Sequence, residues 1–102
     1  MTKEEELYIR IGHQLNGTEQ SQLFGKPCFK IKGKAFICFF QNEMVFKLSG
    51  NSHQQAINLN DAKLFDPSGK QRPMKEWVQV PAVHSEKWVF FAEAAKQYVG
   101  GI

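Results

Sequence analysis

The chain has 102 residues, of which 42% are hydrophobic, and this is enough for one domain with a single core but too little for two. Thirteen basic and ten acidic residues leave a formal net charge of +3, and the excess lies in residues 20–50, where five lysines face one glutamate. The longest wholly apolar run, residues 35–40, is too short to span a bilayer, and no signal-peptide pattern is present, so we expect a soluble cytoplasmic protein without a membrane partner.

The first predicted element is a helix that begins at Thr2, whose hydroxyl suits a helix cap and is followed by glutamates that suit the positive end of the helix dipole. Apolar residues recur four positions apart from Leu7 to Leu15 and predict a narrow apolar stripe. Gly17 is expected to end the helix. Residues 18–22 are polar, and we interpret them as a connection.

Residues 24–48 are expected to form a three-stranded antiparallel meander, because apolar runs alternate there with turn residues. A two-residue turn is predicted at residues 33–34 and a three-residue turn at residues 41–43. This register sets Phe29 opposite Cys38, and cross-strand partners lie on the same face of a sheet.

The predicted meander has two faces of different composition, because side chains alternate along each strand. The first face is wholly apolar and is expected to be the core: Phe29, Ile31, Phe36, Cys38, Phe40, Met44, Phe46 and Leu48. The second face mixes lysines with apolar residues: Cys28, Lys30, Lys32, Ala35, Ile37, Phe39, Val45 and Lys47. The two cysteines would then lie on opposite faces and could not form a disulfide.

The second half of the chain is expected to add a short helix over residues 53–59, strands over residues 63–65 and 74–80, and a last helix that opens at Ser85. The predicted order is α-β-β-β-α-β-β-α. Strands joined by hairpins favour an α+β domain with an antiparallel sheet, built from the meander and a two-stranded unit, with the helices packed on one face. We expect residues 1–102 to be one such domain.

Several segments together resemble a known family. They are Gln22-Leu23-Phe24-Gly25, Cys28-Phe29-Lys30-Ile31, the Gly33-Lys34 turn, the strands over residues 35–40 and 44–48, Phe65, Gly69-Lys70, Met74 and Val80-Pro81. The pattern, with the final amphipathic helix, is similar to the amino-terminal domain of the TfoX/Sxy competence-regulator family and covers nearly the whole chain. The resemblance implies a stand-alone α+β domain of a type that mostly lacks an assigned activity. The more distant YjbR-like proteins have a similar order of elements, which implies DNA binding as one role.

No catalytic, metal or cofactor site is predicted. His13, His53 and His84 lack the spacing of metal ligands, and the chain has no Cys-x-x-Cys pair. The Gly-Lys pairs lack phosphate-loop spacing and are interpreted as turns. Cys28 lies near lysines that would lower its pKa, but no histidine adjoins it in sequence to act as a base.

The second face of the meander is the candidate interaction face. Its lysines and its aliphatic and aromatic residues would form a basic and apolar patch that is unusual on a monomer: Lys30, Lys32, Ile37, Phe39, Val45 and Lys47. Three interpretations compete. Another copy or another protein covers the patch, or single-stranded nucleic acid stacks on it, or the chain's own helices or residues 66–73 cover it.

The sequence leads us to predict a non-enzymatic interaction domain that forms a homodimer or binds another protein. The alternative is a nucleic-acid-binding module that uses the same basic and apolar face. A third hypothesis, an enzyme acting on a small molecule, lacks a set of converging titratable groups.

Overall fold

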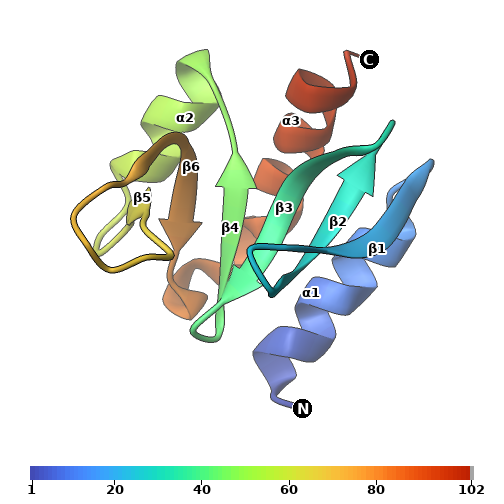
Figure 1. Ribbon diagram of the computed structural model, residues 1–102, viewed down its shortest axis with the longest axis horizontal. Coiled ribbons are helices and arrows are strands. Elements are labelled where there is room, and N and C mark those ends of the chain that lie inside the picture. The colour runs from blue at the N-terminus through green and yellow to red at the C-terminus, as the bar shows by residue number, and fades with distance from the viewer. Residues whose placement is uncertain (102) are drawn as a thin grey trace.

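The computed structural model describes residues 1–101, which form three α-helices, one 3-10 helix and a six-stranded antiparallel sheet (Figure 1). In chain order the elements are α1 (Lys3–Gln14), β1 (Thr18–Leu23), β2 (Lys26–Ile31), β3 (Lys34–Phe40), β4 (Glu43–Lys47), α2 (Gly50–Ile57), β5 (Lys63–Phe65), β6 (Met74–Val80), η1 (Ala82–Lys87) and α3 (Trp88–Gly100). The strands are ordered β1-β2-β3-β4-β6-β5 across the sheet. The predicted α+β class and antiparallel sheet are confirmed, and no helix among the described residues is long and apolar enough to cross a bilayer.

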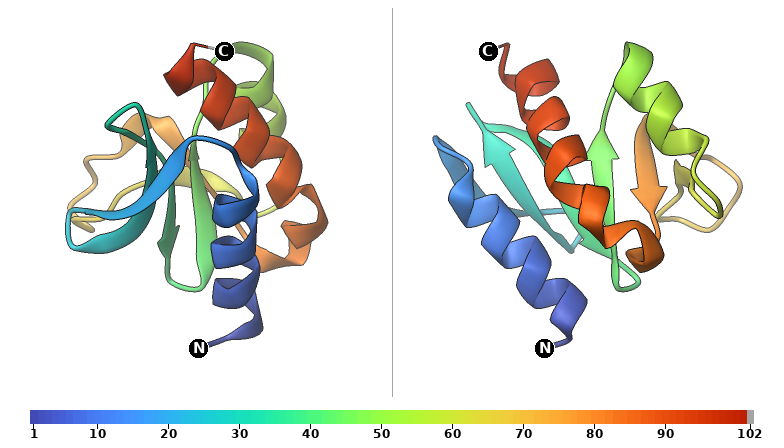
Figure 2. Two further views of the ribbon diagram at one scale, coloured as in Figure 1. Left: turned by 90° about the vertical axis from the view of Figure 1, so that its right-hand side faces the viewer. Right: turned by 180° about the vertical axis from the view of Figure 1, so that it is seen from behind.

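The molecule has two layers, with the helices on one face of the sheet (Figure 2). Helix α3 lies against β3 and β4, α1 lies beside β1 and contacts α3, and α2 lies against β6. The other face carries no helix, and the connection between β5 and β6 curls beside it (Figure 1). The arrangement of helices on a single face therefore agrees with the prediction.

The main core lies between the sheet and the helices. Trp88, the first residue of α3, is fully buried, and its indole Nε1 donates a hydrogen bond to the Val80 carbonyl oxygen at 3.3 Å. Gly12 of α1 lets the Phe29 ring lie directly on the helix backbone, because a Cβ at position 12 would come within 2.2 Å of that ring. One aromatic side chain therefore fixes each of these two helices to the sheet. Phe29 of β2 packs on α1, and Trp88 of α3 hydrogen-bonds to β6.

The segment predicted as a connection is an edge strand. β1 pairs with β2 along its whole length, from Thr18 opposite Ile31 to Leu23 opposite Lys26. The Thr18 hydroxyl donates to the carbonyl oxygens of Gly12 and Leu15, which ties the strand to the end of α1. Only one face of an edge strand needs apolar side chains. The sequence of β1 is mostly polar, and its apolar pattern therefore did not predict a strand.

The predicted register of the first hairpin is wrong. The turn is Lys32-Gly33, and both residues have positive φ (52° and 78°), as a type I′ turn requires. A bulge follows in β3. Ala35 pairs with Lys30 and Ile37 pairs with Phe29, so Phe36 is an extra residue without a partner in β2. Beyond this bulge every side chain of β3 lies on the face opposite to the one predicted.

The second hairpin also differs from the prediction. Its turn has two residues, Gln41 and Asn42 (φ 54° and 63°), so that Phe40 pairs with Glu43. A two-residue turn matches the right-handed twist of the strands better than the predicted three-residue turn. With both hairpins in their observed registers, residues 37–40 lie on the faces opposite to those predicted.

Candidate interaction face

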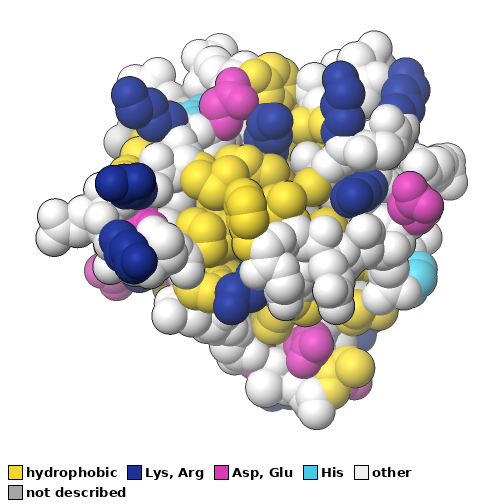
Figure 3. Space-filling view, in the orientation of Figure 1, with side chains coloured by type: hydrophobic (Ala, Val, Ile, Leu, Met, Phe, Trp, Pro, Cys, Tyr) yellow, Lys and Arg dark blue, Asp and Glu magenta, His cyan; other side chains and the backbone are white. Residues whose placement is uncertain are grey.

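The face of the sheet that carries no helix, called the open face below, differs from the face predicted. Its floor consists of buried side chains from β2, β3, β4, β5 and β6: Cys28, Cys38, Val45, Phe65 and Trp77. Partly buried apolar residues surround this floor: Leu23, Ala35, Phe40 and Met74. Figure 3 shows the resulting hydrophobic patch over the middle of the sheet.

Two of the six predicted face residues belong to the core between sheet and helices. Ile37 is fully buried there, and Phe39 stacks on the Tyr8 ring with the centroids 5.1 Å apart. The bulge at Phe36 is the reason, because it moves the end of β3 to the other face. Neither residue can contact a partner on the open face.

The other four predicted residues are placed differently from one another. Val45 belongs to the floor of the open face, and the register puts Lys30 and Lys47 on the same face. Lys32 is instead a turn residue, and its Nζ donates to the Gly100 carbonyl oxygen at 2.8 Å. The structure therefore brings together Lys30, Val45 and Lys47 and leaves out the other three.

Basic side chains surround the patch on the open face (Figure 3). Strand register places four lysines there, and Arg72 of the β5–β6 connection lines a hollow together with Lys26: Lys26, Lys30, Lys47, Lys63 and Arg72. The carboxylates on this side are fewer: Glu19, Glu43 and Asp66. The open face is therefore positively charged even after these carboxylates are taken into account.

Several of these cations have no ionic partner in the described part of the chain. Lys47 forms an ion pair with Glu76 at 3.8 Å, and Lys30 lies opposite Glu19 across the β1–β2 ladder. Within residues 1–101 no carboxylate comes within ion-pair distance of Lys26 or Arg72. Both cations are thus free to meet an anionic partner.

Aromatic rings form a row across the open face. Lys26 Nζ lies 5.2 Å from the centroid of the Phe40 ring, a cation–π contact. Phe40 packs edge-on against Phe65 at 5.3 Å, and Phe65 lies 6.3 Å from Trp77. Phe24, in the β1–β2 turn, is 61% exposed and completes the set at the rim.

Two hollows border the β5–β6 connection. One, of ≈ 410 Å³, is lined by Phe24, Lys26, Pro67, Ser68, Arg72 and Met74. A larger one, of ≈ 800 Å³, adjoins Phe40, Lys63 and Gln79. Asp66 shapes this connection by accepting hydrogen bonds from the Ser68 hydroxyl and the Gly69 amide, and these contacts lower its pKa, the Ser68 contact most.

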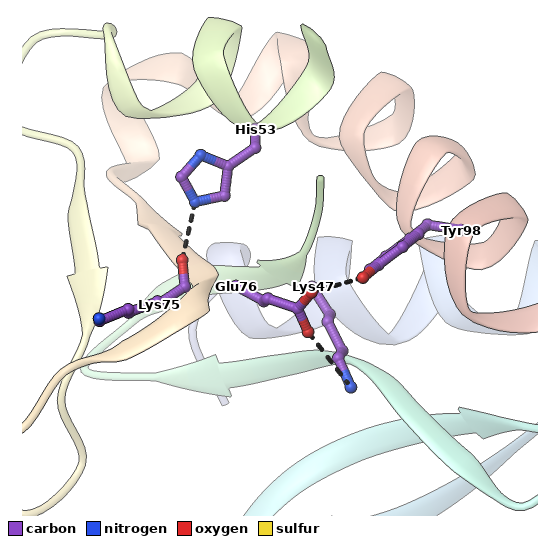
Figure 4. Close-up of polar contacts among 5 residues, drawn as sticks. All are labelled: Lys47, His53, Lys75, Glu76 and Tyr98. Carbon is purple, nitrogen blue, oxygen red and sulfur yellow. Dashed lines mark hydrogen bonds and ion pairs between the residues drawn. The ribbon is translucent and has the colours of Figure 1, made fainter. Parts of the chain in front are cut away.

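Polar contacts at the rim fasten the layers together (Figure 4). The Glu76 carboxylate accepts a hydrogen bond from the Tyr98 hydroxyl of α3 and pairs with Lys47 of β4. The bond to Glu76 raises the pKa of Tyr98. His53 of α2 contacts the Lys75 carbonyl oxygen through Nε2 at 2.8 Å. These residues join helices to strands, and we assign them a structural role.

Sequence reasoning missed the residues that dominate the open face: Phe24, Lys26, Phe40, Trp77 and Arg72. The Phe24-Gly25-Lys26 segment carried a usable signal, because a large aromatic residue inside a glycine turn has little chance of burial. Phe40 and Trp77 depend on register, which the sequence did not determine. Within the described residues, no group of three or more His, Cys, Asp or Glu is placed to hold a metal ion.

A scan of protein-family models finds no match to this chain, and searches of curated proteins and of solved structures likewise find no match. The resemblance to the TfoX/Sxy amino-terminal domain therefore stays a prediction from sequence.

Proposed function

We propose that this chain is a non-enzymatic binding domain that holds single-stranded nucleic acid on its open face. The observation that carries the proposal is the combination, on the sheet face without helices, of a row of aromatic rings with Lys26 and Arg72, which have no carboxylate within ion-pair distance among residues 1–101. Proteins that bind single strands without strict sequence preference combine these two features, a positive groove for phosphates and aromatic rings for bases. The resemblance to YjbR-like proteins carries the same implication.

Each part of the open face has a role in this proposal. Lys26 and Arg72 line the ≈ 410 Å³ hollow and supply positive charge for the phosphates. Phe24, exposed beside them, offers a ring on which a base stacks. Phe40 supplies a second ring, once Lys26 turns from its face toward a phosphate. Phe65 and Trp77 beneath hold Phe40 in place.

The same charges argue against a second copy on the open face. In a dimer with two-fold symmetry the two copies would present the same positively charged rim to each other. Like charges across an interface cost free energy and select against such pairing. The open face is therefore a poor site for a homodimer.

Self-association remains a second candidate function, and the helix layer favours it. Val89 and Phe90 of α3 are 42% and 57% exposed, and Tyr98 is 42% exposed on the same helix. Exposed apolar side chains that gather on one helix indicate a protein contact. We propose that any dimer uses α3, and light scattering of Phe90→Ala against the unchanged chain would test it.

The proposal includes a cytoplasmic location. Single-stranded nucleic acid is available there, and two free cysteines suit a reducing compartment.

Fluorescence anisotropy with a labelled oligothymidylate tests nucleic-acid binding. Phe24→Ala is expected to weaken binding by about 1–3 kcal/mol, the usual loss for one stacked base. Arg72→Ala is expected to reduce the slope of log K against log salt concentration by about 0.7, the value for one phosphate contact on a single strand.

Two variants on the helix layer are matched controls. Val83 is an exposed apolar residue of η1 and Lys87 is an exposed cation of the same element, so Val83→Ala and Lys87→Ala remove an apolar side chain and a charge elsewhere. Both are expected to bind as the unchanged chain does. Equal losses in the open-face variants and in these controls would show that binding is non-specific charge attraction and would sink the proposal.

A further inference from the structure

The two cysteines are directly opposite each other on neighbouring antiparallel strands. Cys28 of β2 pairs with Cys38 of β3, and both side chains belong to the floor of the open face. Both thiols are free and buried, with relative exposures of 1% and 0%. The predicted placement on opposite faces is wrong, because the turn at Lys32-Gly33 and the bulge at Phe36 bring the two residues into register.

This register meets the geometric requirement of a disulfide. Directly opposite residues of an antiparallel pair have their Cα atoms about 4.5–5.5 Å apart. Disulfides join residues whose Cα atoms lie roughly 4.4–6.8 Å apart, with Cβ atoms about 3.5–4.5 Å apart. A disulfide between Cys28 and Cys38 therefore needs only a small approach of the two Cβ atoms.

The surroundings favour Cys28 as the reacting sulfur. The neighbouring Cys38 thiol does most to lower the pKa of Cys28. Burial opposes the shift, while Lys30 and the Ser21 hydroxyl add to it. The neighbouring Cys28 sulfur, together with burial, raises the pKa of Cys38, so the first sulfur to lose its proton is that of Cys28.

We propose that Cys28 and Cys38 form a reversible cross-strand disulfide when the chain meets a small disulfide oxidant such as oxidised glutathione. The Cys28 thiolate attacks one oxidant sulfur and expels a glutathione thiolate, which leaves a mixed disulfide. The Cys38 thiol then loses its proton to water, and its sulfur attacks the Cys28 sulfur and expels the second glutathione. Two thiols and one small disulfide become one protein disulfide and two small thiols, with two electrons passed to the oxidant.

The oxidant reaches Cys28 by local opening at the sheet edge. Only β1 separates β2 from the edge, and its exposed polar side chains bury little surface. Segments with few buried contacts open at low free-energy cost. The reaction is thus expected in the folded chain, but more slowly than for an exposed thiol.

Equilibration in glutathione redox buffers tests the proposal. The folded chain and the chain in concentrated guanidinium are each brought to equilibrium, quenched with acid and weighed by mass spectrometry. The ratio of the disulfide to the dithiol form is expected to be at least about tenfold higher in the folded chain, because the register holds the sulfurs together. The oxidised chain is expected to melt roughly 5–15 °C above the reduced chain.

The opposite results would overturn the proposal. A lower disulfide fraction in the folded chain than in guanidinium would show that the sheet holds the two sulfurs apart. A product that is a stable glutathione adduct, or a dimer linked between chains on a non-reducing gel, would do the same. Cys38→Ser is the matched control, since it keeps Cys28 and is expected to stop at the mixed disulfide.

Discussion

Tyr8 shows how one side chain can be well packed and still hold an unused polar group. Its ring is buried between α1 and the sheet, 5.1 Å from the Phe39 ring and 5.3 Å from the Phe29 ring. Its hydroxyl is buried and has no hydrogen-bond partner among residues 1–101. Burial raises the pKa of Tyr8, so the hydroxyl stays protonated at ordinary pH. A buried polar group without a partner costs free energy.

Tyr8→Phe is therefore expected to stabilise the protein. The change keeps the ring contacts and removes the buried hydroxyl, so we expect the free energy of unfolding to rise by about 1 kcal/mol. Urea denaturation followed by circular dichroism measures this change, and the m value should stay constant. A loss of more than about 1 kcal/mol would mean that the hydroxyl has a bound partner, such as a buried water.

The last two residues of β3 lie on opposite faces from those that the sequence-based register predicts. Phe39 is 8% exposed and packs against Tyr8, whereas Phe40 is only partly buried on the open face. Phe39→Ala is expected to cost about 3–5 kcal/mol of stability, and Phe40→Ala clearly less.

Chemical denaturation of both variants measures this order. The sequence-based register predicts the reverse, with Phe40 needed for folding and Phe39 for association. A larger loss of stability in Phe40→Ala than in Phe39→Ala would contradict the bulge at Phe36 and the face assignment built on it.

Local sequence patterns were sufficient to predict the helices but not every strand. Helical periodicity depends only on the segment itself, so the apolar stripe of α1 and the last helix were predicted, although Ser85 lies in the 3-10 helix η1 and α3 begins at Trp88. β1 was missed, because a polar edge strand is defined by its pairing with β2. Alternation along β6 lets only one of Trp77 and Val78 face the helices, and the structure places Val78 there.

Register was the main obstacle to predicting the site. Gly33 occupies the second position of its turn, with Lys32 in the first, and either placement of a two-residue turn suits the sequence. The bulge at Phe36 then reverses the faces of the residues that follow it, because both Phe36 and Ile37 pack in the core between the sheet and the helices. Errors of one residue therefore sent Phe39 to the wrong face and hid the contact between the cysteines.

At the scale of the whole molecule, charge and apolar exposure are distributed between the two layers. The open face carries five basic residues around its apolar floor, whereas the exposed side of α3 carries Val89 and Phe90 together with Glu93. A positive groove attracts anionic strands and raises their local concentration. We therefore expect nucleic acid to bind the open face.

Nuclear magnetic resonance of the ¹⁵N-labelled chain during titration with an unlabelled oligothymidylate shows where nucleic acid binds. The account predicts that the largest amide shift changes fall at Phe24, Lys26, Phe40 and Arg72, with little change along α3. Higher salt should weaken the binding without moving the affected residues. Shift changes confined to α3, or no changes at a large excess of oligonucleotide, would contradict the account.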